Sequence, residues 1–225
     1  MPADHVREGP LDDAAIERLR LAAEEVAWLT GRGYGLEAVG EFVARHHQLS
    51  ADQRAAIAKG TCSEPQYRRR AARELEAEDV AKRTLSIDAV DAIATLEAAL
   101  AMQPILQTLD GTVRAFGNDG ARHVPGPHAE DAIDRLLRAA KELRPSLLRF
   151  VLVAGSPLEA LIMARAENLK VKVEMVHAND ALKALRKEKQ IVTGDADTLD
   201  ACGAWFNLVG RVAMAIPGAK IVRLQ

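Results

Sequence analysis

Residues 85–100 read LSIDAVDAIATLEAAL, and this stretch decides the fold. Its first six residues form an apolar run of strand length, and an amphipathic helical pattern follows at about 91–101. The same alternation continues downstream. Further strand-length runs lie at 147–153, 171–176, 190–193 and 205–209, and helical patterns lie at 129–143, 157–167 and 179–188. Apolar strands that alternate with amphipathic helices predict a parallel sheet covered by helices on both faces.

The chain before residue 84 has a different pattern. Residues 12–82 repeat apolar side chains every three to four positions, which is typical of helices packed by one face. Ser50 with Gln53, and Ser63 with Gln66, match the capping box that begins a helix. We therefore expect four short helices here, the last of them long and highly charged.

The whole chain is predicted to be an α/β protein in two parts. A small all-helical N-terminal domain (residues 1–83) precedes a three-layer, mostly parallel α/β domain (residues 84–225). Between the first two predicted strands, residues 104–127 have four glycines and three prolines. Such a composition favours a loop, and LDGTVRAF at 109–116 predicts a small hairpin within it.

Composition and charge limit the classes of partner. The formal net charge is −2 and the sequence pI about 6.3, so binding to nucleic acid would require a local basic patch. No apolar run approaches the roughly 18 residues of a membrane helix, and the charged start does not resemble a secretory signal. Cys62 and Cys202 have no C-x-x-C spacing and are expected to be reduced thiols. These features predict a cytoplasmic protein without membrane contact, compatible with a homodimer.

Aspartates follow the predicted strands at several places. Asp88 and Asp91 follow the first strand, Asp180 follows the third, and Asp195 and Asp197 follow the fourth. The carboxyl ends of parallel strands share one edge of a sheet, so these carboxylates would repel one another unless protonated or bound to a cation. Oxygen ligands suit Mg²⁺ or Mn²⁺, which assist phosphodiester hydrolysis. Each aspartate alone is better explained as a helix cap, whereas four of them at the ends of three strands favour a functional cluster.

Three segments that contain these aspartates resemble motifs of a known superfamily. TGDADTL at 193–199, NDALKAL at 179–185 and SIDAVDAIATLEAAL at 86–100 resemble motifs of the PIN-like nucleases, which include PIN, NYN and flap-endonuclease domains. The resemblance implies metal-binding and catalytic roles for Asp88, Asp180, Asp195 and Asp197, with Asp91, Glu97 and Asp200 as supporting acids. Over about residues 25–210, the chain is also similar to an uncharacterised prokaryotic family with the same two-part layout.

These observations give one leading hypothesis and two alternatives. The leading hypothesis is a nuclease that depends on Mg²⁺ or Mn²⁺ and hydrolyses RNA, with DNA as the other candidate substrate. The alternatives are an inactive PIN-like module that binds nucleic acid or protein, and a metal-dependent phosphatase with a closed pocket near Asp195.

A row of arginines offers a candidate contact with nucleic acid. Arg68, Arg69, Arg70 and Arg73 lie on one predicted helix, where they could bind phosphates. The alternative is a solvated helix in which the arginines pair with the following acids, as Arg70 would with Glu74.

Overall fold

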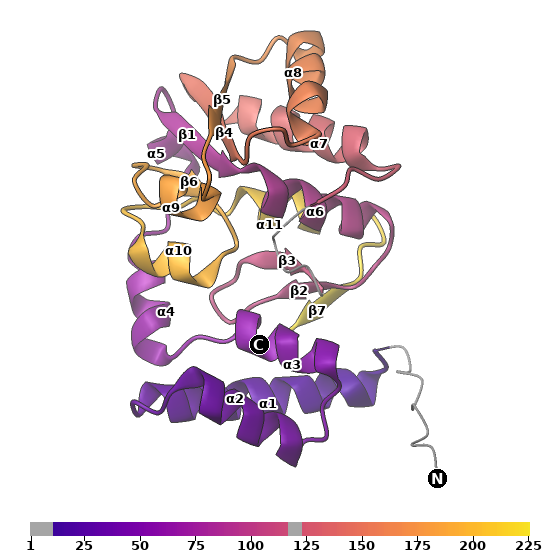
Figure 1. The fold of residues 1–225 in the computed structure, drawn as a ribbon, viewed down its shortest axis with the longest axis vertical. Coiled ribbons are helices and arrows are strands. Elements are labelled where there is room, and N and C mark those ends of the chain that lie inside the picture. The colour runs from indigo at the N-terminus through magenta and orange to yellow at the C-terminus, as the bar shows by residue number, and fades with distance from the viewer. Residues whose placement is uncertain (1–10, 117–122) are drawn as a thin grey trace.

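The computed structural model describes residues 11–116 and 123–225. Its centre is a four-stranded, wholly parallel sheet with the strand order β5-β4-β1-β6 (Figure 1). The strands are β1 (Thr84–Asp88), β4 (Leu147–Leu152), β5 (Val173–His177) and β6 (Ile191–Val192). All four lie within the apolar runs that predicted them or within two residues of those runs. The expected mixed α/β fold with a parallel sheet is therefore confirmed.

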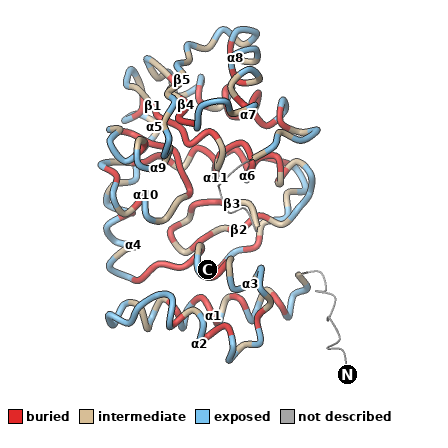
Figure 2. Tube along the Cα trace, in the orientation of Figure 1, coloured by how far each residue is buried: buried red, intermediate tan, exposed pale blue. Residues whose placement is uncertain are grey.

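Apolar side chains cover both faces of this sheet. Alternate residues of a strand point to opposite faces, so Phe150 packs into the larger core while Val151 packs into the smaller one. The larger core is completed by α6 (Ala89–Leu100), α7 (Ala129–Glu142), α8 (Leu158–Leu169) and α11 (Leu208–Met214). The smaller core is completed by α9 (Ala181–Leu185) and α10 (Ala196–Ala201). Figure 2 shows the central strands buried between these helices.

A second, three-stranded sheet was only partly predicted. The expected hairpin forms from β2 (Ile105–Gln107) and antiparallel β3 (Val113–Ala115), with Gly111 at a φ of +84° in the turn. Positive φ costs glycine little, which suits it to this position. The third strand, β7 (Ile221–Arg223), runs parallel to β2 and was not predicted.

The N-terminal part is helical, as expected. Its elements are α1 (Asp13–Gly31), α2 (Leu36–His46), α3 (Ala51–Gly60), α4 (Glu64–Ala71) and α5 (Ala77–Val80). Both predicted capping boxes form, at Ser50 with Gln53 and at Ser63 with Gln66. The apolar face of these helices packs on the second sheet, through Leu106, Val222 and Leu224. This core therefore combines residues from both sides of the predicted boundary at residue 83. No described helix is long and apolar enough to cross a membrane.

Two predicted elements differ from the structure. The charged helix expected to be long is short, because α4 ends at Ala71 and the Leu75 N–H donates to the Trp205 carbonyl oxygen (2.8 Å). Residues 205–209, expected as a strand, contribute only isolated bridges at Trp205. Asn207 then caps α11 by accepting the Gly210 N–H (3.2 Å), which converts the apolar run into a helix start.

Candidate functional site

The candidate site lies where the strand order reverses. From β1 the chain moves to β4 and β5 on one side, and it returns to β6 on the other side of β1. Crevices at the carboxyl ends of strands beside such a switch point are the usual ligand sites of parallel α/β sheets. Asp88 ends β1, and Thr193, Gly194 and Asp195 follow β6, so these residues meet at this point.

Asp88 is buried at the end of β1, with 6% of its surface exposed. One carboxylate oxygen accepts the Asp91 N–H (3.2 Å), which caps α6, and the other accepts the Thr193 hydroxyl (3.2 Å). Burial, followed by the negative charge of Asp91, raises the pKa of Asp88 to about 7. Asp88 therefore exchanges its proton near neutral pH.

Asp91 joins the ends of the two strands. Its Oδ2 accepts the Gly194 N–H (2.7 Å), which follows β6. Burial raises the pKa of Asp91, although the charge of Arg114 and the bond from Gly194 act in the opposite direction. A Cβ atom at position 194 would lie 3.0 Å from both Asp91 Oδ2 and Arg114 Cγ, so glycine allows the two side chains to approach the backbone closely.

Asp195 is the third acid of the site and is partly exposed. Its Oδ1 caps α10 by accepting the Thr198 N–H (2.7 Å), and Arg186 Nη2 lies 4.0 Å from the same oxygen. The negative charge of Asp195 contributes to the raised pKa values of Asp88 and Asp91, which places the three carboxylates in one electrostatic group.

The three aspartates line one cavity of about 650 Å³. Lys59 of α3 and Arg114 of β3 supply positive charge to the same cavity, and His123 also lines it. Apolar side chains complete the walls, among them Val90, Val153 and Leu182. The cavity thus combines carboxylates at strand ends with cations from the helical part and from the second sheet.

The other predicted acids lie outside this cavity. Asp180 is exposed and caps α9 through the Lys183 N–H (2.8 Å), and Asp197 is exposed in the first turn of α10. Glu97 is buried on α6, where it accepts the Gly126 N–H (2.9 Å) and contacts the cavity-lining His123. The structure therefore brings Asp88, Asp91 and Asp195 together at one cavity, whereas Asp180 and Asp197 are not among the residues that line it.

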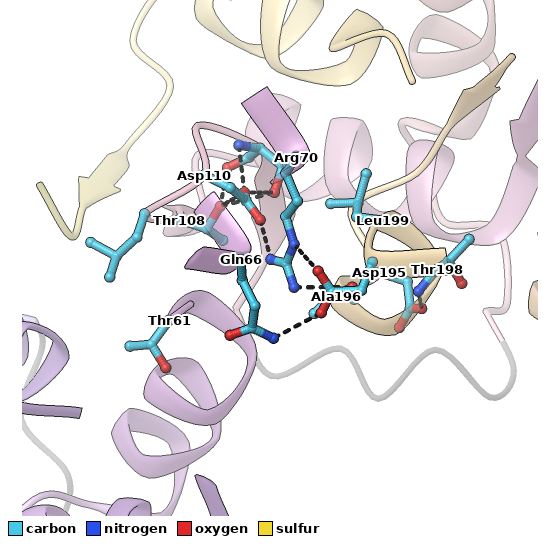
Figure 3. A network of polar contacts seen from close by, with 12 residues as sticks. Thr61, Gln66, Arg70, Thr108, Asp110, Asp195, Ala196, Thr198 and Leu199 are labelled. Carbon is cyan, nitrogen blue, oxygen red and sulfur yellow. Dashed lines mark hydrogen bonds and ion pairs between the residues drawn. The ribbon is translucent and has the colours of Figure 1, made fainter. Parts of the chain in front are cut away.

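Asp200 is one of two carboxylate partners of Arg70, and Figure 3 shows Arg70 with the other, Asp110. Arg70 is 2% exposed, and its Nε donates to Asp200 Oδ1 (2.8 Å) while its Nη1 donates to Asp110 Oδ2 (2.5 Å). Burial alone would lower the pKa of Arg70, but these two carboxylates raise it. Its guanidinium is thus engaged inside the protein, contrary to the surface position that a phosphate contact at Arg70 would need.

The remaining arginines of that row do not form one surface. Arg68 is exposed and paired with Glu64 (2.6 Å), Arg69 is exposed, and Arg73 donates to the carbonyl oxygens of Asp200 and Cys202. The predicted pairing of Arg70 with Glu74 does not form, since its partners are Asp110 and Asp200. Among the arginines of α4, this leaves Arg68 and Arg69 at the surface.

Two comparisons with known proteins identify the family. A family profile described as "Domain of unknown function (DUF5616)" matches residues 77–211, and one described as "Protein of unknown function (DUF434)" matches residues 18–73. The chain belongs to the DUF5616 family, which confirms the expected family of unknown function. It is also similar to "Uncharacterized protein MJ0935" of Methanocaldococcus jannaschii, with 28% identity over 120 residues, which cover 53% of this chain and 58% of that protein. The match thus spans just over half of the relative. No solved structure matches the chain.

Proposed function

We propose that this protein is a divalent-metal-dependent phosphodiesterase with a PIN-like α/β domain, and that RNA is its substrate. The observation that supports this is the meeting of Asp88, Asp91 and Asp195 at the ends of two adjacent strands, in a cavity that also holds Lys59 and Arg114. Carboxylates suit a hard cation and the two basic side chains suit phosphate, so the cavity offers ligands for both parts of such a site.

The acids fit an open site for Mg²⁺ or Mn²⁺ better than a closed cage. Among the described residues, no group of three or more His, Cys, Asp or Glu side chains is arranged to hold a metal ion. Mg²⁺, however, is usually held by one or two carboxylates and completed by water and substrate phosphate. The hydrogen bonds from Gly194 and Thr198 use Asp91 Oδ2 and Asp195 Oδ1, so the other oxygen of each carboxylate is the one proposed for a cation.

The roles of the residues follow from their contacts. Asp91 and Asp195 would hold the ion, which when bound would neutralise charge on the phosphate and acidify the attacking water. Asp88 positions this pair, because it caps the helix that begins before Asp91 and binds the Thr193 hydroxyl. With a pKa near 7, Asp88 can also hold or release a proton at the pH of the reaction.

The test is cleavage of end-labelled single-stranded RNA with Mn²⁺, with single-stranded DNA in a parallel reaction. We expect Asp91→Asn and Asp195→Asn to lower the rate by roughly 100-fold or more, as for other charge-stabilising groups. Asp131→Asn is the matched control, because Asp131 is exposed on α7 and pairs with Arg135 there. Equal rates for wild type and both site variants would refute the proposal. RNA binding without cleavage would instead favour an inactive binding module.

One observation favours a second candidate, a phosphatase for small phosphate esters. The cavity volume of about 650 Å³ falls within the range of small-molecule sites, roughly 300–1,000 Å³. Model substrates separate the two activities. Faster hydrolysis of bis(p-nitrophenyl) phosphate than of p-nitrophenyl phosphate would support the diesterase, and the reverse order would support the phosphatase.

A further inference from the structure

Arg114 of β3 is a buried cation with unused hydrogen-bond donors. Only 8% of its surface is exposed, and its Nε and Nη2 atoms are buried without a hydrogen-bond partner among the described residues. Buried donors are nearly always bonded, since an unpaired donor loses its hydration without compensation. An unpaired guanidinium that lines a cavity therefore indicates a ligand with acceptor oxygens.

The nearby carboxylates do not use these donors. Burial acts to raise the pKa of Asp110, but the hydrogen bond from Thr108 and then the nearby positive charge of Arg114 help to lower it below its ordinary value. Its oxygens are already bonded, Oδ1 to Thr108 and Thr112 and Oδ2 to Arg70. Asp91, the other neighbour, accepts the Gly194 N–H on its Oδ2 and accepts no hydrogen bond from Arg114 Nε or Nη2.

The surroundings hold Arg114 in place. The Arg114 side chain packs against Gly194: a Cβ atom added at Gly194 would lie 3.0 Å from Arg114 Cγ and 3.3 Å from Arg114 Nε. On the backbone, Arg114 pairs with Leu106 across the hairpin. Lys59 lines the same cavity from α3, and its positive charge acts on Asp91 as that of Arg114 does. The positive charge at the cavity thus comes from α3 and β3, which lie far apart in the sequence.

We propose that Arg114 binds the phosphate group of the ligand in this cavity, with Lys59 adding positive charge. The guanidinium fork matches two oxygens of a phosphate and gives short, charge-assisted hydrogen bonds. The inference deepens the proposed function, on which it rests for the choice of phosphate, because it assigns the group that holds the substrate opposite Asp91 and Asp195.

The test is calorimetric titration of the full chain with inorganic phosphate in EDTA, so that neither cation nor turnover is involved. We expect wild type to bind, Arg114→Gln to bind roughly 10–100-fold more weakly, and Arg114→Lys to fall between them, since lysine keeps the charge without the fork. Arg45→Gln, at an exposed arginine of α2, should bind as wild type does. No binding by wild type, or equal binding by Arg114→Gln, would overturn the proposal.

Two further measurements check the fold of the variant and the choice of anion. Circular dichroism shows whether Arg114→Gln is folded. A second test uses wild type alone: phosphate should raise its melting temperature, and acetate should not. Equal stabilisation by acetate would refute a phosphate site. A nuclease test that fails while phosphate still binds at Arg114 would remove the catalytic proposal and keep this one. RNA cleavage by a protein that does not bind phosphate in EDTA would keep the catalytic proposal and remove this one.

Discussion

The Arg70 Nη1 atom lies 2.5 Å from Asp110 Oδ2, and both side chains are only 2% exposed. Arg70 belongs to α4 and Asp110 to the turn of the β2–β3 hairpin, so the ion pair joins the helical part to the second sheet. The same guanidinium reaches Asp200 at the end of α10 and the Ala196 carbonyl oxygen (3.1 Å). Arg70 thus connects α4 to the hairpin that carries Arg114 and to the helix that Asp195 caps.

Replacement of Arg70 by methionine should destabilise the protein strongly. Arg70→Met would leave Asp110 buried without its cation, and breaking one side of a buried pair costs about 3–5 kcal/mol. Urea unfolding followed by tryptophan fluorescence would measure the change in the free energy of unfolding. Arg68→Met, at an arginine whose side chain is 76% exposed, should change it by less than about 1 kcal/mol. Similar effects of the two variants would contradict a structural role for Arg70.

Asp88 should make stability depend on pH. The folded carboxyl keeps its proton up to about pH 7, whereas in the unfolded chain it releases the proton near its ordinary pKa of about 3.9. Between these values the folded state binds more protons, so this group's contribution to stability is full below about pH 4 and is lost as the pH rises through 7. The full loss is on the order of 4 kcal/mol.

An Asp88→Asn variant tests that dependence directly. Asparagine can still accept the Asp91 N–H and does not titrate, so the variant should gain stability relative to wild type as the pH rises. Free energies of unfolding in urea with EDTA, at about pH 5 and pH 8, would give the difference. The same pH dependence for both proteins would show that Asp88 is ionised in the folded state throughout this range.

The central sheet could be predicted because buried parallel strands read as continuous apolar runs. Of the second sheet, the β2–β3 hairpin could be predicted from its turn residues, but β7 could not, since it has three residues and too little pattern to recognise. Residues 205–209 were misread because a short apolar run fits a strand or a buried helix start equally well, and only the cap at Asn207 decides between them. The end of α4 depends on contacts with Trp205, which lies far away in the sequence.

Only the acidic residues at the strand ends of the candidate site could be predicted from the sequence. Asp88, Asp91 and Asp195 follow from the rule that parallel strands end at one edge. Asp180 immediately precedes Ala181 and Leu182, which line the cavity, but it is not itself a lining residue, and one of its carboxylate oxygens caps α9. Lys59 and Arg114 reach the cavity through the packing of α3 and the hairpin, so no local sequence motif predicts their place in the site.

Gly194→Ala should disturb the site more than the fold. The added Cβ would meet Asp91 Oδ2 and Arg114 Cγ at 3.0 Å, so both side chains must move by a few tenths of an ångström. We expect cleavage to fall by roughly 10-fold, since small misplacements of positioned groups are costly. The cost in stability should be about 1 kcal/mol.

Gly40→Ala is the matched control for this change. Gly40 lies inside α2 with open space around its Cβ position, so alanine there should raise stability by up to about 1 kcal/mol and leave cleavage unchanged. Cleavage rates and melting temperatures of both variants would separate the site from the fold. A Gly194→Ala variant with wild-type activity would show that the spacing of Asp91 and Arg114 is not critical.

Mn²⁺ should stabilise the folded protein through Asp91 and Asp195. An ion that binds only the folded state raises stability, by about 2.7 kcal/mol at a concentration 100 times its dissociation constant. The melting temperature of wild type should therefore rise with Mn²⁺ and fall back with EDTA. Asp91→Asn should lose most of this rise, and Asp131→Asn should keep it.

The dependence of this rise on pH gives a second, independent check. Burial and mutual repulsion raise the pKa values of Asp88 and Asp91, so protons compete with the ion for the same carboxylates. The stabilisation by Mn²⁺ should thus be larger at about pH 8 than at about pH 5.5. An equal rise at both pH values, or in Asp91→Asn, would place the binding of Mn²⁺ elsewhere on the protein and remove the main support for metal-dependent chemistry at this site.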